Sequence, residues 1–231
     1  MTSEISIRAI SGLPEISAGT NLADCILEYF EPEHHDVLVI SQKLVSKAES
    51  RVVPLNDQKT YDDLIRAEAV RIVRQRGDLI ITETKHGFVC ANSGVDRSNI
   101  EPGHVVLLPE DPDYSAQRIC DRIKGVSNVS VGIIVTDTFG RPWRRGVTDI
   151  ALGCAGIAPI LNLSGTVDRH GNTMTTTEIC LADELASAAE LVRGKSTGNG
   201  VVLIRGGDDG WFGKGTIRDA VVRPPEEDLF R

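Results

Sequence analysis

The sequence predicts an α+β fold with mixed, largely antiparallel sheets, packed helices and two intertwined lobes. Expected strands and helices are mixed along the chain without the strict alternation that a doubly wound parallel sheet requires. Several expected strands are separated only by short turns, as in hairpins. No repeat of about 20 to 50 residues and no clear linker divides the 231 residues. We therefore expect one domain over residues 1–231.

The first part of the chain is expected to form two strands around a helix. Residues 5–10 have the pattern of a short strand, and residues 36–40 that of a buried one. Asn21 is placed to cap the helix between them. Apolar residues recur there at the spacing of one helix face: Leu22, Cys25, Ile26 and Tyr29.

The middle of the chain is expected to carry a long helix and a hairpin. Residues 61–76 are charged on one face and apolar at Leu64, Ala67 and Val70 on the other, which is typical of an amphipathic helix. Gly77 would end this helix. Residues 79–84 and 88–91 are expected to pair around a short turn.

The second half of the chain mixes helices and strands. The expected helices cover residues 115–124 and 182–193, and the expected strands cover residues 131–135, 173–178 and 201–204. Gly194 would end the second helix. Residues 223–231 are expected to form a polar tail.

Composition excludes several classes of protein. The net charge of -8 argues against general binding to nucleic acid or to an anionic membrane surface. No apolar run approaches the roughly 20 residues that span a bilayer, and the N-terminus lacks the layout of a signal peptide. The 5 cysteines are widely spaced, without a C-x-x-C pair, which argues against a zinc site or a disulfide framework. We expect a cytoplasmic protein that acts on small molecules.

The stretch 136–146 carries the strongest chemical signal. It follows the expected buried strand 131–135, and we interpret it as a loop that begins with Asp137 and Thr138 and continues into Arg141, Arg144 and Arg145. Such a loop can place a metal ligand beside guanidinium groups that bind phosphate or carboxylate in a bidentate manner. A solvated loop with surface arginines is the alternative.

A second acidic residue follows the expected strand 88–91. Asp96 lies in the stretch 92–99, and with Asp137 and the Thr138 hydroxyl it makes an all-oxygen donor set. Hard oxygen ligands suit Mg²⁺ or Mn²⁺, which retain waters and take up phosphate oxygens. Each acid alone could instead form an Asx turn or a helix cap. The sequence does not show that they converge.

Other candidate groups lie in scattered turns, because there is no Walker A motif and no G-x-G-x-x-G. Lys47 could neutralise a nucleotide phosphate, or it could be a helix-surface lysine paired with Glu49 or Glu68. The glycine-rich stretch 194–200 could cradle phosphate with its backbone, or it could be a flexible connector.

Together these motifs resemble the coenzyme F-420-0:L-glutamate ligase family, whose members add γ-linked glutamate to a deazaflavin coenzyme. The resemblance runs in order along nearly the whole chain and is carried by residues 12–14, 46–49, 85–87, 90–99, 136–146, 178–184 and 205–206. The closing residues 223–231 resemble the junction at which bacterial relatives continue into a nitroreductase-like domain, which we do not expect in these 231 residues.

The resemblance implies a GTP-dependent ligase in which Asp96, Asp137 and Thr138 hold Mg²⁺ or Mn²⁺, with K⁺ as a further candidate ion. It also implies a homodimer. The positions that would contact GTP are Ser11, Gly12, Leu13, Pro14, Ser41, Gln42, Lys47 and Asn99, and the loop that would cover it includes Lys195, Ser196, Thr197 and Gly198. Some family members have an acidic metal ligand where this chain has Lys195.

The residue patterns and the family resemblance indicate the same reaction. Phosphoryl transfer from GTP to a carboxylate of the coenzyme would give an acyl phosphate, which the amino group of glutamate attacks, and GDP and phosphate are released. We expect Asp137, Arg144 and Arg145 to act in this reaction by positioning and electrostatics. Two alternatives stay open: a non-catalytic GTP- or deazaflavin-binding module, and a metal-dependent phosphohydrolase.

Overall fold

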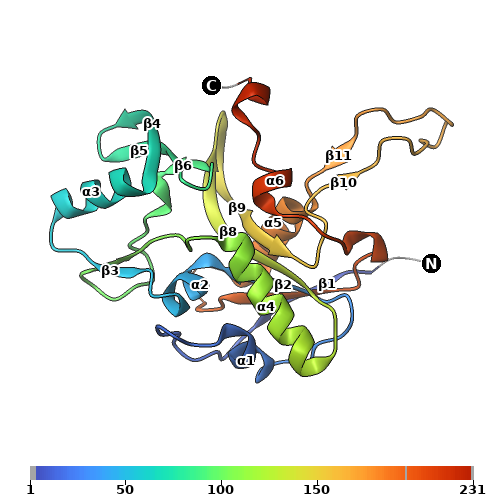
Figure 1. The fold of residues 1–231 in the computed structure, drawn as a ribbon, viewed down its shortest axis with the longest axis horizontal. Coiled ribbons are helices and arrows are strands. Elements are labelled where there is room, and N and C mark those ends of the chain that lie inside the picture. Colours follow the sequence, from blue (N-terminus) through green and yellow to red (C-terminus); the bar gives the residue numbers. More distant parts are fainter. Residues whose placement is uncertain (1–3, 196, 230–231) are drawn as a thin grey trace.

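A computed structural model gives the structure of this protein and describes residues 4–195 and 197–229. Its centre is a five-stranded sheet (Figure 1). In order across the sheet the strands are β1 (Ser6–Ile10), β12 (Val201–Arg205), β2 (Val37–Ser41), β8 (Gly132–Arg141) and β9 (Arg144–Ala155). β2 and β8 are parallel, and the other three pairs are antiparallel. The predicted α+β class with mixed, largely antiparallel sheets is confirmed.

Helices cover both faces of this sheet, which explains why β12, β2 and the first half of β8 are nearly continuous apolar runs. On one face, Leu38 and Ile40 pack in a core with α1 (Leu22–Leu27) and α4 (Pro112–Ser127). On the other face, Val37 and Val39 pack in a core with α5 (Leu181–Arg193) and α6 (Ile217–Ala220). The alternation along β2 follows from the two-residue period of a strand.

The segment between α2 (Gln42–Ala48) and α4 forms a smaller unit with its own core. It contains α3 (Gln58–Glu68), a sheet of β4 (Ala69–Arg76), β5 (Leu79–Thr84) and β6 (Val89–Ala91), and a pair of β3 (Val52–Pro54) and β7 (His104–Val106). Tyr61, Ile65 and Ile80 are buried in its core. The predicted hairpin around residues 85–87 is β5 and β6.

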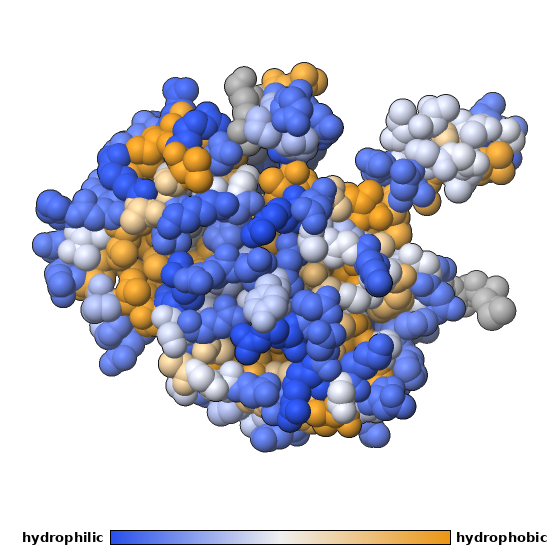
Figure 2. All heavy atoms as spheres, in the orientation of Figure 1, coloured by the Kyte–Doolittle hydropathy of each residue, from blue (hydrophilic) through white to orange (hydrophobic). Residues whose placement is uncertain are grey.

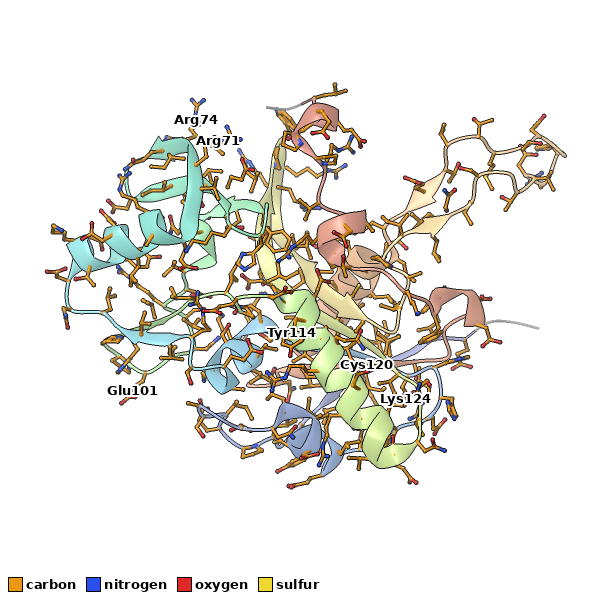
Figure 3. All side chains as sticks on the ribbon, in the orientation of Figure 1. Arg71, Arg74, Glu101, Tyr114, Cys120 and Lys124 are labelled. Carbon is orange, nitrogen blue, oxygen red and sulfur yellow. The ribbon has the colours of Figure 1, made fainter. Side chains whose placement is uncertain are left out.

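The expected helix over residues 61–76 is wrong beyond Glu68. Asp57 caps α3 by accepting a hydrogen bond from the Thr60 backbone N–H at 2.7 Å, and the chain turns extended at Ala69. Residues 69–76 then pair with β5, because β-branched Val70, Ile72 and Val73 suit a strand. Val70 is 68% exposed rather than facing a core. Apolar side chains gather on the surface over β4 and β5 (Figure 2), and Arg71 and Arg74 project outward from β4 (Figure 3).

The stretch 136–146, expected as a loop after a strand, is a β-hairpin. β8 continues to Arg141, and β9 begins at Arg144, so Asp137 and Thr138 lie within a strand. Trp143, with φ of 57°, occupies the tip. β9 was missed because its buried half, from Ile150 to Ala155, is rich in alanine and glycine, which are weak strand signals.

The expected strand over 173–178 is also largely wrong. Only Glu178 and Ile179 form a strand, β11, which pairs with β10 (Leu161–Asn162). Thr173 makes an isolated bridge with Val167. The two strands form the base of an arm that projects from the body (Figure 1). In the part of the chain that is described, no helix is long and apolar enough to cross a membrane.

Candidate active site

Asp96 lies just after the 3-10 turn that follows β6, and it is held as an ion. Its carboxylate accepts hydrogen bonds from the Ser98 backbone N–H at 2.6 Å and the Ser98 hydroxyl at 3.0 Å. Lys43 on α2 forms an ion pair with it at 2.8 Å. Partial burial raises the pKa of Asp96, but the bonds from Lys43 and Ser98 outweigh burial and lower that pKa overall. Asp96 therefore forms the Asx turn that was the alternative interpretation and also carries the charged carboxylate that a metal ligand requires.

Asp137 is the most perturbed acid of the site. Its pKa is raised from 3.8 to about 7, mainly by burial and also by the negative charges of Asp96 and Asp149, while the Thr138 backbone N–H and Lys43 oppose the shift. No ion pair to Asp137 forms within the described residues. The two predicted acids, Asp96 and Asp137, thus share one electrostatic environment, in which Lys43 acts on both.

Thr138 faces a residue that the sequence analysis did not single out. Thr138 and Asp149 are opposite each other across β8 and β9, and the Thr138 hydroxyl donates to Asp149 Oδ1 at 2.6 Å. Asp149 is 1% exposed and pairs with Arg193 at 2.5 Å. Burial lowers the pKa of Arg193, although the charges of Asp149 and Glu190 oppose that shift. A buried acid within a strand can be recognised in a sequence as a candidate site residue, but Asp149 could be recognised in this way only if β9 had been predicted.

Lys195 brings a second cation to the same hydroxyl. Its Nζ donates to the Thr138 hydroxyl, lies 2.9 Å from a Glu190 carboxylate oxygen and 3.4 Å from Asp149 Oδ1. Gly194, with φ of 65°, ends α5 and turns the chain so that Lys195 reaches β8.

Several of the predicted nucleotide-binding residues also meet here. The Ser41 backbone N–H donates to the Gly200 carbonyl at 2.8 Å, which joins the start of α2 to the glycine-rich stretch. The Asn99 side chain reaches the Lys195 carbonyl at 3.5 Å. Gln42 is fully buried, its Oε1 accepts from the Ser46 hydroxyl at 2.8 Å, and its Nε2 has no partner among the described residues.

Lys47 does not pair with Glu49 or Glu68, the two partners considered from the sequence. It forms an ion pair with Glu15, just beyond the turn of Ser11, Gly12, Leu13 and Pro14. Glu68 pairs instead with Arg51 at 2.9 Å. The Lys47–Glu15 pair ties α2 to that turn, so these predicted contacts lie next to each other.

Two of the three remaining residues of the predicted covering loop, Thr197 and Gly198, lie within the described residues. The Thr197 hydroxyl donates to the Arg193 carbonyl, and exposed Gly198 has φ of 75°. Ser196 lies outside the described residues.

The arginines lie apart from the acids within one chain. Arg141 and Arg144 are paired at the hairpin tip, and Arg145 follows. Four residues separate Asp137 from Arg141 along β8, which is about 13 Å of extended strand. All three arginines are exposed, and none forms an ion pair within residues 4–195 and 197–229. A ligand that spans this distance would contact both groups.

The donor set fits a hard divalent cation in part. Asp96, Asp137 and the Thr138 hydroxyl supply oxygens, and the raised pKa of Asp137 marks a carboxylate that a cation would stabilise. Among the described residues, however, no three His, Cys, Asp or Glu side chains cluster closely enough to hold a metal by themselves. Waters or phosphate oxygens would therefore have to complete the coordination.

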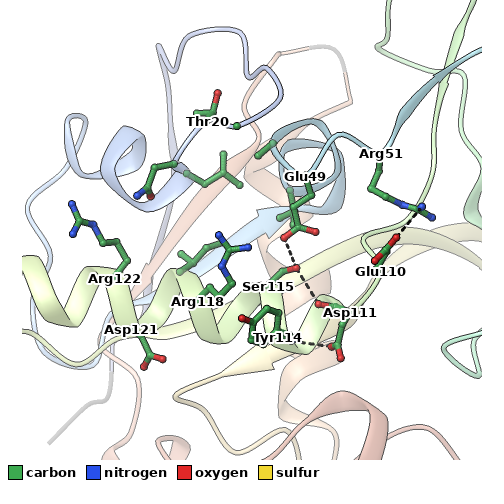
Figure 4. Close-up of a pocket in the computed structure, with 16 residues that line it drawn as sticks. Thr20, Glu49, Arg51, Glu110, Asp111, Tyr114, Ser115, Arg118, Asp121 and Arg122 are labelled. Atoms are coloured by element: carbon green, nitrogen blue, oxygen red, sulfur yellow. Dashed lines mark hydrogen bonds and ion pairs between the residues drawn. The ribbon is translucent and has the colours of Figure 1, made fainter.

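A cavity of about 880 Å³ lies elsewhere, along α1, α2 and α4 (Figure 4). Its charges are mixed and largely satisfied within the protein: Arg122 pairs with Asp24 at 2.7 Å, Arg51 pairs with Glu68, and Glu49 accepts from the Ser115 hydroxyl. No predicted site residue lines this cavity, so it is separate from the site around Asp137 and Thr138 on β8.

Comparison with known proteins decides the family. The model of the F420-0:Gamma-glutamyl ligase family matches residues 12–206, which include both acids, the hairpin and Lys195. The chain belongs to this family. It is therefore a ligase, as the resemblance predicted.

Curated relatives agree over most of their length. This ligase is 42% identical over 228 residues to the coenzyme F420:L-glutamate ligase of Methanocaldococcus jannaschii, covering 91% of this chain and 90% of that protein. It is 40% identical to the protein of the same name from Methanopyrus kandleri, covering 94% of each. It is 35% identical to that from Methanothermobacter thermautotrophicus, covering 98% of this chain and 99% of the relative.

Proposed function

We propose that this ligase uses GTP to join L-glutamate, through a γ-linked amide, to coenzyme F420-0, with an acyl phosphate as intermediate. The observation that carries the proposal is the meeting of Asp96, Asp137 and Thr138 with the cations Lys43 and Lys195 around β8, next to the carboxyl end of β2. The names of the relatives support the acceptor and the amino acid.

The reaction needs activation because a free carboxylate has no leaving group. A carboxylate oxygen of the acceptor attacks the γ-phosphorus of GTP, and the bond to GDP breaks. The glutamate nitrogen then attacks the acyl carbon, phosphate leaves with the bonding electron pair, and the nitrogen loses a proton. Phosphoryl transfer of this kind depends on positioning and charge stabilisation more than on a protein nucleophile.

Each group of residues has a role in the proposal. Asp96, Asp137 and Thr138 would hold Mg²⁺ or Mn²⁺, which offsets negative charge on phosphoryl oxygens. Lys43 and Lys47 add positive charge beside the turn formed by Ser11, Gly12, Leu13 and Pro14. Arg144 and Arg145 would hold the phosphate or the carboxylates of the acceptor, because a guanidinium binds both in a bidentate manner.

The proposal includes a homodimer in the cytoplasm, where GTP and glutamate are available. The hairpin tip carries Trp143 at 83% and Val147 at 60% exposure, and the β10–β11 arm extends from the body (Figure 1). Exposed apolar residues on projecting elements are typical of interfaces. A second chain could also bring arginines closer to the acids than the roughly 13 Å of strand allows within one chain. Sedimentation equilibrium tests this part.

The decisive assay separates this function from its alternatives. The protein is incubated with GTP, Mg²⁺ or Mn²⁺, glutamate and F420-0, and mass spectrometry looks for one added glutamyl residue. A binding module would bind GTP without consuming it, and a phosphohydrolase would release phosphate without glutamate. Product formation that requires all components, and that Asp137→Ala abolishes without loss of folding, supports the ligase. Unchanged turnover of Asp137→Ala would remove Asp137 from the mechanism.

A further inference from the structure

The ammonium of Lys195 occupies a cluster of oxygens contributed by three elements. Thr138 comes from β8, Asp149 from β9 and Glu190 from α5, and the Lys195 Nζ contacts an oxygen of each. A hydroxyl and two carboxylates are a donor set suited to a hard cation. In this chain a side chain supplies that cation.

The charges of the cluster are already balanced. Asp149 and Glu190 carry the negative charges, while Arg193 and Lys195 carry the positive ones. Arg193 is buried and holds Asp149 Oδ2 from the opposite side of the carboxylate. A divalent ion placed between Thr138 and Asp149 would therefore meet the Lys195 ammonium, and the two carboxylates of the cluster carry no unpaired negative charge to offset the repulsion.

Asp96 and Asp137 differ from this cluster. Asp96 is paired with Lys43, and Asp137 forms no ion pair among the described residues. A divalent ion would therefore find an unpaired carboxylate on the Asp137 side of Thr138, whereas Arg193 and Lys195 already pair with the carboxylates of Asp149 and Glu190. Lys195 also remains accessible, since 58% of its side chain is exposed, so the ammonium can reach a ligand phosphoryl group.

We infer that Lys195 is a built-in cation that takes the place of a second metal ion, so that each site of this ligase binds one divalent ion rather than two. In the transfer step its ammonium stabilises negative charge on the phosphoryl group. The role in transfer rests on the proposed function, whereas the number of bound ions does not.

The test counts metal ions directly. Mn²⁺ bound per subunit is measured by electron paramagnetic resonance of the free ion, with Mn²⁺ alone and with saturating GDP, and with neither glutamate nor coenzyme present. The wild-type protein should bind one Mn²⁺. Lys195→Glu should bind two, because it replaces the ammonium with a carboxylate. Lys195→Arg, which keeps the charge, and Lys124→Gln, an exposed lysine on α4 (Figure 3), should each bind one.

The possible outcomes separate the inference from the function. Two Mn²⁺ in the wild-type protein, or one in a folded Lys195→Glu variant, would overturn the inference, whatever the ligase assay shows. If Lys195→Glu does not fold, Lys195→Gln is used, and a weak second site at millimolar Mn²⁺ that the wild type lacks supports the inference. Absence of this second site in Lys195→Gln would count against the inference.

In the ligase assay Lys195→Gln should lose tenfold or more in kcat, which corresponds to about 1.4 kcal/mol. Part of the lost kcat should return at high Mg²⁺.

Discussion

The Thr138 hydroxyl donates a hydrogen bond to the buried carboxylate of Asp149 directly across the β8–β9 pair, at 2.6 Å. The same carboxylate binds the Arg193 guanidinium at 2.5 Å. The predicted metal-binding hydroxyl is thus fixed by an acid from the neighbouring strand, which is fixed in turn by the end of α5. The position of Thr138 depends on the packing of three elements.

Replacing Asp149 should destabilise the fold strongly. Asp149→Asn removes the closer of the two counter-charges of the buried Arg193, which leaves Glu190 at 3.7 Å. Breaking a buried pair from one side costs about 3–5 kcal/mol. Urea unfolding measures this loss. The matched control is Asp63→Asn, which removes the exposed pair of Lys59 and Asp63 and should cost less than about 0.5 kcal/mol. Equal effects of the two variants would show that burial of the Asp149 pair does not matter.

Asp137→Asn should stabilise the metal-free protein, and more so at higher pH. Below about pH 4 the carboxyl is protonated in both states. As pH rises towards the folded pKa of about 7, the unfolded chain loses the proton first, so wild-type stability falls. Above that pKa the loss is complete, and a shift of about three units corresponds to at most about 4 kcal/mol.

Thermal unfolding of metal-free wild type and Asp137→Asn across this pH range measures the difference. The gain in stability should be small near pH 4 and largest near pH 8. A gain that is independent of pH would contradict the raised pKa of Asp137.

Gly153→Ala should disrupt the contact between β9 and the start of α4. A methyl group at this position would overlap the backbone of Pro112 and Asp113. The Asp113 carboxylate there accepts the Cys154 and Ile217 backbone N–H groups, each at 2.8 Å, so the helix start cannot shift without losing them. We expect a loss of about 3 kcal/mol or more.

The matched control for this variant is Gly125→Ala. Gly125 lies within α4, and a methyl group there would contact nothing within 4 Å. Alanine should stabilise the helix by about 0.5–1 kcal/mol. Denaturant unfolding of both variants distinguishes close packing at Gly153 from a general effect of the substitution.

Arg144→Ala and Arg145→Ala should impair the reaction without affecting stability. Both side chains are exposed at the hairpin tip. If they hold the acceptor, its KM should rise about tenfold or more, as expected for the loss of a charge-assisted contact, while KM for GTP stays constant. Arg74→Ala on the exposed strand β4 serves as the control. An unchanged KM for the acceptor in both variants would argue against this role.

Local patterns were sufficient for the central elements. Continuous apolar runs predicted the buried strands around Val39, Ile134 and Leu203, and helical spacing predicted α1, α4 and α5. Motif order predicted the family. These features depend on the character of neighbouring residues, which the sequence displays directly.

Tertiary structure decided where strands extend and what faces the site. Whether residues 69–76 form helix or strand was settled by pairing with β5, and Asp137 lies within a strand because β9 pairs with β8. Asp149, Arg193 and Lys195 meet only through the β8–β9 register and the turn at Gly194. The sequence by itself determined which chemical groups this ligase carries, and long-range pairing determined which of them share one site, because contacts between distant segments leave no local pattern.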